Sequence, residues 1–178
     1  MTRPVVTYDE LCQLVDGYEE LAKAQGLLVR ADIAELEITV RTIDATPRRG
    51  RILSELAFQI QTQDDKAAPL VGCRAHHPDL GLCRTADLLV VTEDALDGQS
   101  DDFAVFGPEV SIAIEVSSAD DGHAAPPVYG RMGVPAYAHI DPRNATITVH
   151  DGPTRTYKFG DAVRLNDWTI DTSKFPTC

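Results

Sequence analysis

Apolar residues at helical spacing follow a helix-start signal near the beginning of the chain. Thr7 and Glu10 have the spacing of a capping box, a threonine with a glutamate three residues later. The apolar positions behind it recur three or four residues apart: Leu11, Leu14, Val15, Tyr18, Leu21 and Ala22. This pattern predicts an amphipathic helix over residues 8–25. The apolar residues between Ile52 and Ile60 predict a second helix, which ends near residue 62.

Elsewhere the pattern indicates strands. Leu36, Ile38 and Val40 alternate with polar residues, which predicts a half-buried strand paired with residues 28–33. Further strands are expected at residues 70–73, 87–91, 110–116, 137–140, 146–150, 154–159 and 168–171, the last at a sheet edge. Residues 74–82 lack a clear period and are expected to be irregular. Residues 93–107 are expected to form a loop or a short helical turn, and a short helix is expected at 128–132. This order predicts one α/β domain, residues 1–178, with a mixed central sheet flanked by helices.

Two of the buried runs carry one acid each. Asp87 begins the run Asp87-Leu88-Leu89-Val90-Val91, and Glu115 lies near the end of the run from Val110 to Val116. A buried carboxylate is costly without a partner, and a divalent cation readily accepts two carboxylates from neighbouring strands. The alternative is that backbone N–H groups or an arginine such as Arg84 satisfy these acids. If the site is metal-free, the two like charges repel, so replacing both acids with alanine should leave the fold intact or more stable.

Composition and charge narrow the choice of partners. The 178 residues are 43% hydrophobic and 25% charged, as in ordinary globular domains, and the net charge is −12. This charge disfavours DNA as a partner, although a local basic patch could still bind it. Arg48, Arg49 and Arg51 form a tight basic cluster, for which the alternative is a solvated loop and first helical turn.

Membrane and metal signals are weak. No apolar run reaches the roughly 20 residues of a membrane span, and the first residues do not resemble an export signal. We therefore expect no membrane contact and a cytoplasmic location with mostly reduced cysteines. Cys73, His76, His77 and Cys83 could ligate zinc, but their spacing is not that of a standard finger, and a loop with incidental thiols is the alternative.

Three segments together resemble the Uma-two family of restriction endonucleases, within the PD-(D/E)xK nuclease superfamily. Ala86-Asp87-Leu88-Leu89-Val90-Val91 is similar to the family's Pro-Asp-Leu-Leu-Val-Val strand. Ile114-Glu115-Val116-Ser117-Ser118 is similar to its Val-Glu-Val strand and the Ser-Pro-Ser that follows. Tyr129 and the segment from Gly133 to Pro142 resemble the most specific mark, a tyrosine followed by Gly-(Ile/Val)-Pro-x-Tyr-Trp-Ile-Val-Asp-Pro. The resemblance covers nearly the whole chain.

The resemblance implies a restriction-endonuclease-like fold and metal-dependent cleavage of DNA. By position, Asp87 and Glu115 would bind Mg²⁺ or Mn²⁺ as metal and catalytic residues, and Asp32 would be the family's early catalytic acid. The alternative for Asp32 is a solvent-facing strand residue. The ion would activate a water and stabilise charge on the phosphate. A family lysine would help to orient that water.

That lysine is missing from this chain. Its place is Ala125, and no lysine occurs between Lys66 and Lys158. His123, which titrates near neutrality, is a candidate substitute, with a solvated loop histidine as the alternative. Two functions therefore stay open: a metal-dependent DNA endonuclease, or an inactive member that acts as a binding or scaffold module, for example as a homodimer.

Overall fold

The computed structural model describes residues 6–43, 45–97, 104–117 and 127–177. Its helices are α1 (Tyr8–Ala24), α2 (Pro47–Gln63) and α3 (Pro127–Arg131), with short 3₁₀ turns η1 (Pro78–Leu80), η2 (Glu93–Leu96) and η3 (Gly107–Glu109). The capping box is confirmed, because Thr7 Oγ1 accepts from the Glu10 N–H and the Glu10 carboxylate accepts from the Thr7 N–H. None of the described helices combines the length and the apolar composition that crossing a membrane requires.

The described strands form two mixed sheets and a two-stranded ribbon. The first sheet has five strands in the order β2-β1-β5-β4-β7: β2 (Glu37–Thr42), β1 (Val29–Ala34), β5 (Leu82–Thr85), β4 (Arg74–His77) and β7 (Ala104–Phe106). The second has six in the order β11-β10-β9-β8-β6-β3: β11 (Thr154–Lys158), β10 (Thr146–His150), β9 (Tyr137–Asp141), β8 (Val110–Val116), β6 (Leu88–Thr92) and β3 (Ala67–Val71). The ribbon pairs β12 (Ala162–Leu165) with β13 (Trp168–Asp171). Within the described strands, β4–β7 and β8–β9 are parallel pairs and the other pairs are antiparallel.

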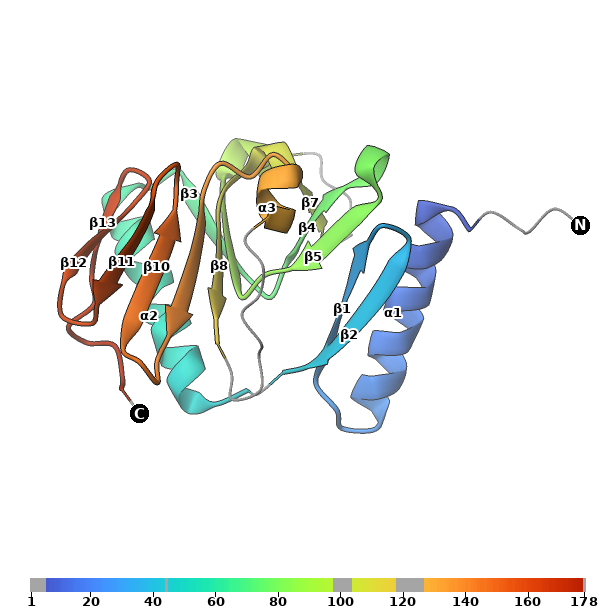
Figure 1. Ribbon diagram of the computed structural model, residues 1–178, viewed down its shortest axis with the longest axis horizontal. Helices are drawn as coiled ribbons and strands as arrows, with labels where there is room; N and C mark the ends of the chain where they lie inside the picture. Colours follow the sequence, from blue (N-terminus) through green and yellow to red (C-terminus); the bar gives the residue numbers. More distant parts are fainter. Residues whose placement is uncertain (1–5, 44, 98–103, 118–126, 178) are drawn as a thin grey trace, which may run out of the picture.

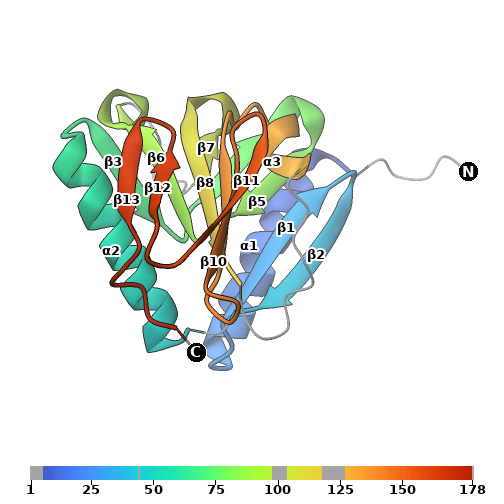
Figure 2. The same cartoon turned by 60° about the vertical axis from the view of Figure 1, so that its left-hand side comes forward.

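Apolar side chains cover both faces of the six-stranded sheet. One face packs its Leu88 and Ile112 against α2 and the β12–β13 ribbon, and Figure 2 shows that ribbon next to α2. The opposite face packs Leu89 and Ala113 against the five-stranded sheet and α3. At the far end of the molecule α1 lies against the β1–β2 hairpin, as Figure 1 shows. The predicted α/β fold with mixed sheets flanked by helices is therefore confirmed.

Several local expectations were wrong. Residues 74–82 are not irregular: β4 and β5 form a hairpin around η1, with Gly81 in the left-handed conformation that its turn requires. Residues 104–106, expected in a loop, form β7, and the strand expected at 70–73 is β3, which begins at Ala67. The strand at 168–171 is present, but it pairs with β12, a strand that no pattern predicted.

Candidate functional site

Asp87 lies directly before β6, against the end of β8. Its backbone N–H donates to the carbonyl of Ile114, and its Oδ2 accepts a hydrogen bond from the Val116 N–H at 2.7 Å. The side chain is 1% exposed. The neighbouring strands thus hold this carboxylate beside Glu115, on the sheet face that packs toward the five-stranded sheet.

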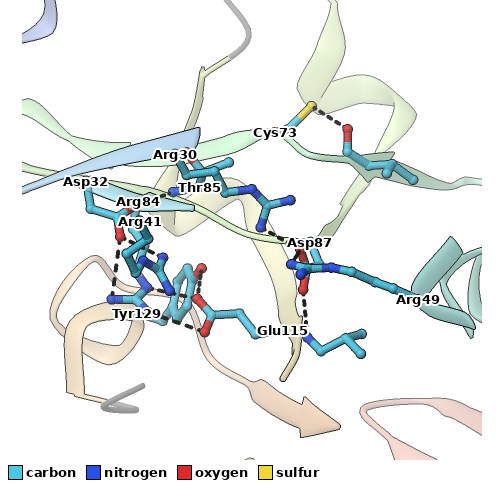
Figure 3. Close-up of polar contacts among 12 residues, drawn as sticks. Arg30, Asp32, Arg41, Arg49, Cys73, Arg84, Thr85, Asp87, Glu115 and Tyr129 are labelled. Atoms are coloured by element: carbon cyan, nitrogen blue, oxygen red, sulfur yellow. Dashed lines mark hydrogen bonds and ion pairs between the residues drawn. The ribbon is translucent and has the colours of Figure 1, made fainter. Parts of the chain in front are cut away.

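Two arginines reach the other oxygen of Asp87. Arg30, on β1, and Arg49, in the first turn of α2, both donate to Asp87 Oδ1 (Figure 3). These two side chains are only 14% and 12% exposed. Charged groups this well shielded from water interact more strongly than surface pairs, so Asp87 is firmly neutralised.

Glu115 has a different set of partners. Arg84 donates from Nε to Oε1 at 2.9 Å and from Nη2 to Oε2 at 3.3 Å. The hydroxyl of Tyr129 donates to Oε1 at 3.0 Å, and that of Tyr137 donates to Oε2 at 3.3 Å. A carboxylate has about four acceptor positions, so these four donors satisfy Glu115 completely.

The charge of Glu115 also changes the acidity of its neighbours. Burial lowers the pKa of Arg84, but the hydrogen bonds and charge of Glu115 more than offset this and raise that pKa above its usual value. Burial, followed by the charge of Glu115, raises the pKa of Tyr129 and of Tyr137. Both phenols therefore stay protonated and remain donors to Glu115 at neutral pH.

Asp32 lies on β1 and is joined to the other acids through arginine. Its Oδ1 accepts from the Thr85 N–H at 3.0 Å, and its Oδ2 accepts from Arg41 Nη2 at 2.7 Å (Figure 3). Nη1 of Arg84 is 3.9 Å from the same Oδ2. Arg84 therefore lies between Asp32 and Glu115 and connects the two sheets.

Two of the predicted acids line one small cavity, of about 20 Å³, room for a single water-sized group. Its lining consists of Arg30, Arg41, Arg49, Asp87, Glu115, Val116, Ser117 and His139. Ser117 Oγ is 2.7 Å from His139 Nε2, and His139 pairs in register with Glu115 across β8 and β9. Asp32 lines a second cavity, of about 170 Å³, which also includes Arg41 and Arg84.

The structure adds residues that the sequence analysis missed. The sequence does not link Arg30, Arg41 or Tyr137 to the acids. It places Arg49 only in a basic cluster, and it predicts no role for His139. The Arg84 partnership was one of the alternatives for the acids, as was a backbone N–H, which Val116 supplies to Asp87. One signal was available: His139 stands where the family motif has isoleucine.

The metal chemistry of the site depends on those arginines. Two carboxylates in one cavity are hard oxygen donors of the kind Mg²⁺ prefers, so the donor set suits the ion. However, hydrogen-bond donors already engage the oxygens of both acids, and a cation would have to displace some of them. Within the described ranges no three His, Cys, Asp or Glu side chains gather as a metal site, the Cys73, His76, His77 and Cys83 set included.

Two sequence positions bear on the missing lysine's role. His123 and Ala125 lie outside the described residues. Arg131, close to Tyr129 in sequence, is 49% exposed and pairs with Glu35 at 3.0 Å. Among the described cations, those that contact the three acids are therefore arginines.

Comparison with known proteins gives a fold. No protein-family model matches the chain, and no curated protein matches it. It is similar to the crystal structure of a putative nuclease belonging to DUF820 from Anabaena variabilis, with a TM-score of 0.68 and 14% sequence identity over 96% of this chain and 97% of that one. The Uma-two assignment is therefore still a prediction. The chain has the α/β fold of that structure.

Proposed function

We propose that this protein hydrolyses phosphodiester bonds of DNA with a divalent cation, Mg²⁺ or Mn²⁺. The observation that carries the proposal is that Asp87 and Glu115, from adjacent strands, line the same cavity. The likeness to a structure described as a nuclease supports it. When bound, the ion would activate a water and stabilise charge on the phosphate.

The protein's own residues would then have distinct roles. Asp87 and Glu115 would hold the ion. Tyr129, Tyr137 and Arg84 fix the orientation of Glu115, whose oxygens they contact. Asp32, which contacts Arg84 rather than the cavity of the other two acids, would support that orientation from β1. Together these contacts would keep the carboxylates in a single geometry.

The second candidate is a non-catalytic binding or scaffold module, for example a homodimer. The observation that favours it is that arginines neutralise all three acids without a metal. Ala125 at the place of the family lysine and the net charge of −12 point the same way. Either activity would take place in the cytoplasm, and the free thiols of Cys12, Cys73 and Cys83 agree with a reducing compartment.

Titration calorimetry with Mn²⁺ and a DNA cleavage assay together separate these candidates. The variants are Asp87→Asn, which keeps the side-chain shape, and Asp65→Asn, which makes the same charge change at an exposed position. Binding that Asp87→Asn abolishes and Asp65→Asn preserves, together with cleavage, supports the nuclease. Binding without cleavage favours the second candidate. If the wild type binds no Mn²⁺, the metal-dependent proposal is wrong.

A further inference from the structure

Three arginines from three different elements converge on one cavity. Arg30 comes from β1, Arg41 from β2 and Arg49 from the first turn of α2, and all three line the cavity that contains Asp87 (Figure 3). Their side chains are largely buried, with Arg41, at 27% exposed, the most accessible. Burying an arginine is unfavourable without a strong partner, so this convergence calls for an explanation.

The carboxylates do not account for all of this positive charge. Among the residues that the structure describes, the site contains four arginines and three acids, which leaves one positive charge in excess: Arg30, Arg41, Arg49 and Arg84 against Asp32, Asp87 and Glu115. The chain as a whole carries −12. A local positive excess within a negative protein attracts anions to this position rather than to the general surface.

The arginines also have unused donors. A guanidinium has five N–H groups, and in the described contacts Arg30, Arg41 and Arg49 each donate one side-chain hydrogen bond, to a carboxylate. The Nε of Arg41 is buried without an acceptor among the described residues, which is unfavourable for folding. An additional oxygen-bearing anion in the cavity would supply the missing acceptors.

The first turn of α2 also favours a bound anion. This turn contains no acid but includes Arg48 and Arg49, although the positive end of a helix dipole disfavours cations. The chain thus accepts an unfavourable charge at the position from which Arg49 reaches Asp87. A bound anion would offset both the dipole and the arginine charges.

We propose that Arg30, Arg41 and Arg49 bind a phosphate group of a nucleic-acid backbone. The nucleic-acid source rests on the proposed function, whereas the phosphate site itself needs no metal. The cavity of about 20 Å³ admits only a water-sized group, so one phosphate oxygen enters first. Full binding requires Arg30 and Arg49 to leave Asp87 Oδ1, which exposes that oxygen to a cation. Phosphate and cation therefore favour each other's binding.

Fluorescence anisotropy with a short labelled single-stranded DNA, and calorimetry with inorganic phosphate, test this in metal-free buffer. Arg41→Gln and Arg49→Gln should each weaken both interactions by about tenfold or more, the value of a charge-assisted hydrogen bond. Arg131→Gln removes the same charge from an exposed arginine and should change them less than about twofold. Asp87→Asn should tighten phosphate binding by a few-fold, because it removes the competing charge.

Other outcomes overturn the inference. Equal weakening by Arg131→Gln would mean that attraction is unspecific, and unchanged affinity in Arg41→Gln and Arg49→Gln would mean that these arginines are structural. Binding of inorganic phosphate without DNA binding would exclude the nucleic-acid backbone as the source. Thermal melting checks each variant, and if Arg49→Gln fails to fold, Arg49→Lys keeps the charge without the guanidinium fork and should still bind more weakly.

The cleavage assay tests the proposed nuclease function separately from the phosphate site. Arginine-dependent DNA binding without Mn²⁺-dependent cleavage would support the phosphate site and refute the nuclease. Cleavage that Arg41→Gln and Arg49→Gln leave unchanged would support the nuclease and refute the phosphate site. Asp87→Asn should lose Mn²⁺ binding while it gains phosphate affinity, so one variant moves the two quantities in opposite directions.

Discussion

Arg84 donates one hydrogen bond to each carboxylate oxygen of Glu115, through Nε and Nη2. Both side chains are nearly buried, at 12% and 8% exposed. Because Arg84 comes from the five-stranded sheet and Glu115 from the six-stranded sheet, this pair joins the two sheets at the candidate site.

Arg84→Ala should therefore destabilise the protein by about 3–5 kcal/mol, the usual cost of breaking a buried pair by removing one partner. Glu115 would keep its two tyrosine donors but lose its counter-charge. Urea unfolding of the variant measures the loss, with Arg143→Ala at an exposed position as the control. A loss below about 1 kcal/mol, the range of surface pairs, would show that water replaces Arg84 without difficulty.

Alanine at both Asp87 and Glu115 should lower stability in metal-free buffer, contrary to what charge repulsion alone suggests. The two acids accept three and four hydrogen bonds, mostly from arginines and tyrosines. Without the two acids these buried donors have no acceptor, so the free energy of unfolding should fall by at least about 3 kcal/mol. Urea unfolding in the presence of a chelator gives the value, and a double variant as stable as the wild type would mean that repulsion dominates.

Stability should fall as the pH rises above 10. Burial and Glu115 raise the pKa of Tyr129 and Tyr137 above the unfolded value of 10.0, so folding favours the neutral phenols. Their contribution is complete below pH 10 and is lost as the pH rises further. Melting temperatures recorded below and above pH 10 test this. Tyr137→Phe should show a shallower alkaline decline than the wild type, and the exposed control Tyr18→Phe should show an unchanged one.

Gly107→Ala should perturb the site from a distance. Gly107 is buried, and a Cβ there would collide with the carbonyl oxygen of Met132, the residue after α3. The expected loss is about 1–3 kcal/mol, and displacement of α3 should weaken the hold of Tyr129 on Glu115. Thermal melting measures it. Gly17→Ala is the matched control, since that position in α1 is open and alanine should stabilise the helix by up to about 1 kcal/mol.

Patterns that a segment carries by itself were predictable from the sequence. The cap of α1, the pairing of β1 with β2 and the buried β8 run are of this kind. The predicted apolar faces were only partly right, since Leu14 and Leu21 of α1 and Val40 of β2 are exposed. The strand β4 was not, because only Ala75 of its four residues is buried and its form depends on pairing with β5 and β7. Local periodicity cannot reveal a strand that its neighbours impose.

The candidate site divides in the same way. Asp87 and Glu115 could be identified because each interrupts an apolar run. Arg30, Arg41 and Arg49 carry no comparable signal in the sequence, because only folding brings β1, β2 and the start of α2 to the acids. The sequence thus predicted which acids are buried and offered Arg84 as a partner, but it did not predict the other three arginines.

The hydrogen bond from the Val116 N–H to Asp87 Oδ2 gives this acid a structural role. It continues the pairing of β6 and β8 beyond their last backbone–backbone hydrogen bond. A carboxylate that accepts from a buried backbone N–H in a sheet contributes to folding whether or not any reaction takes place beside it. The presence of this aspartate is therefore explained by folding alone, and enzymatic activity has to be inferred from the residues that surround it.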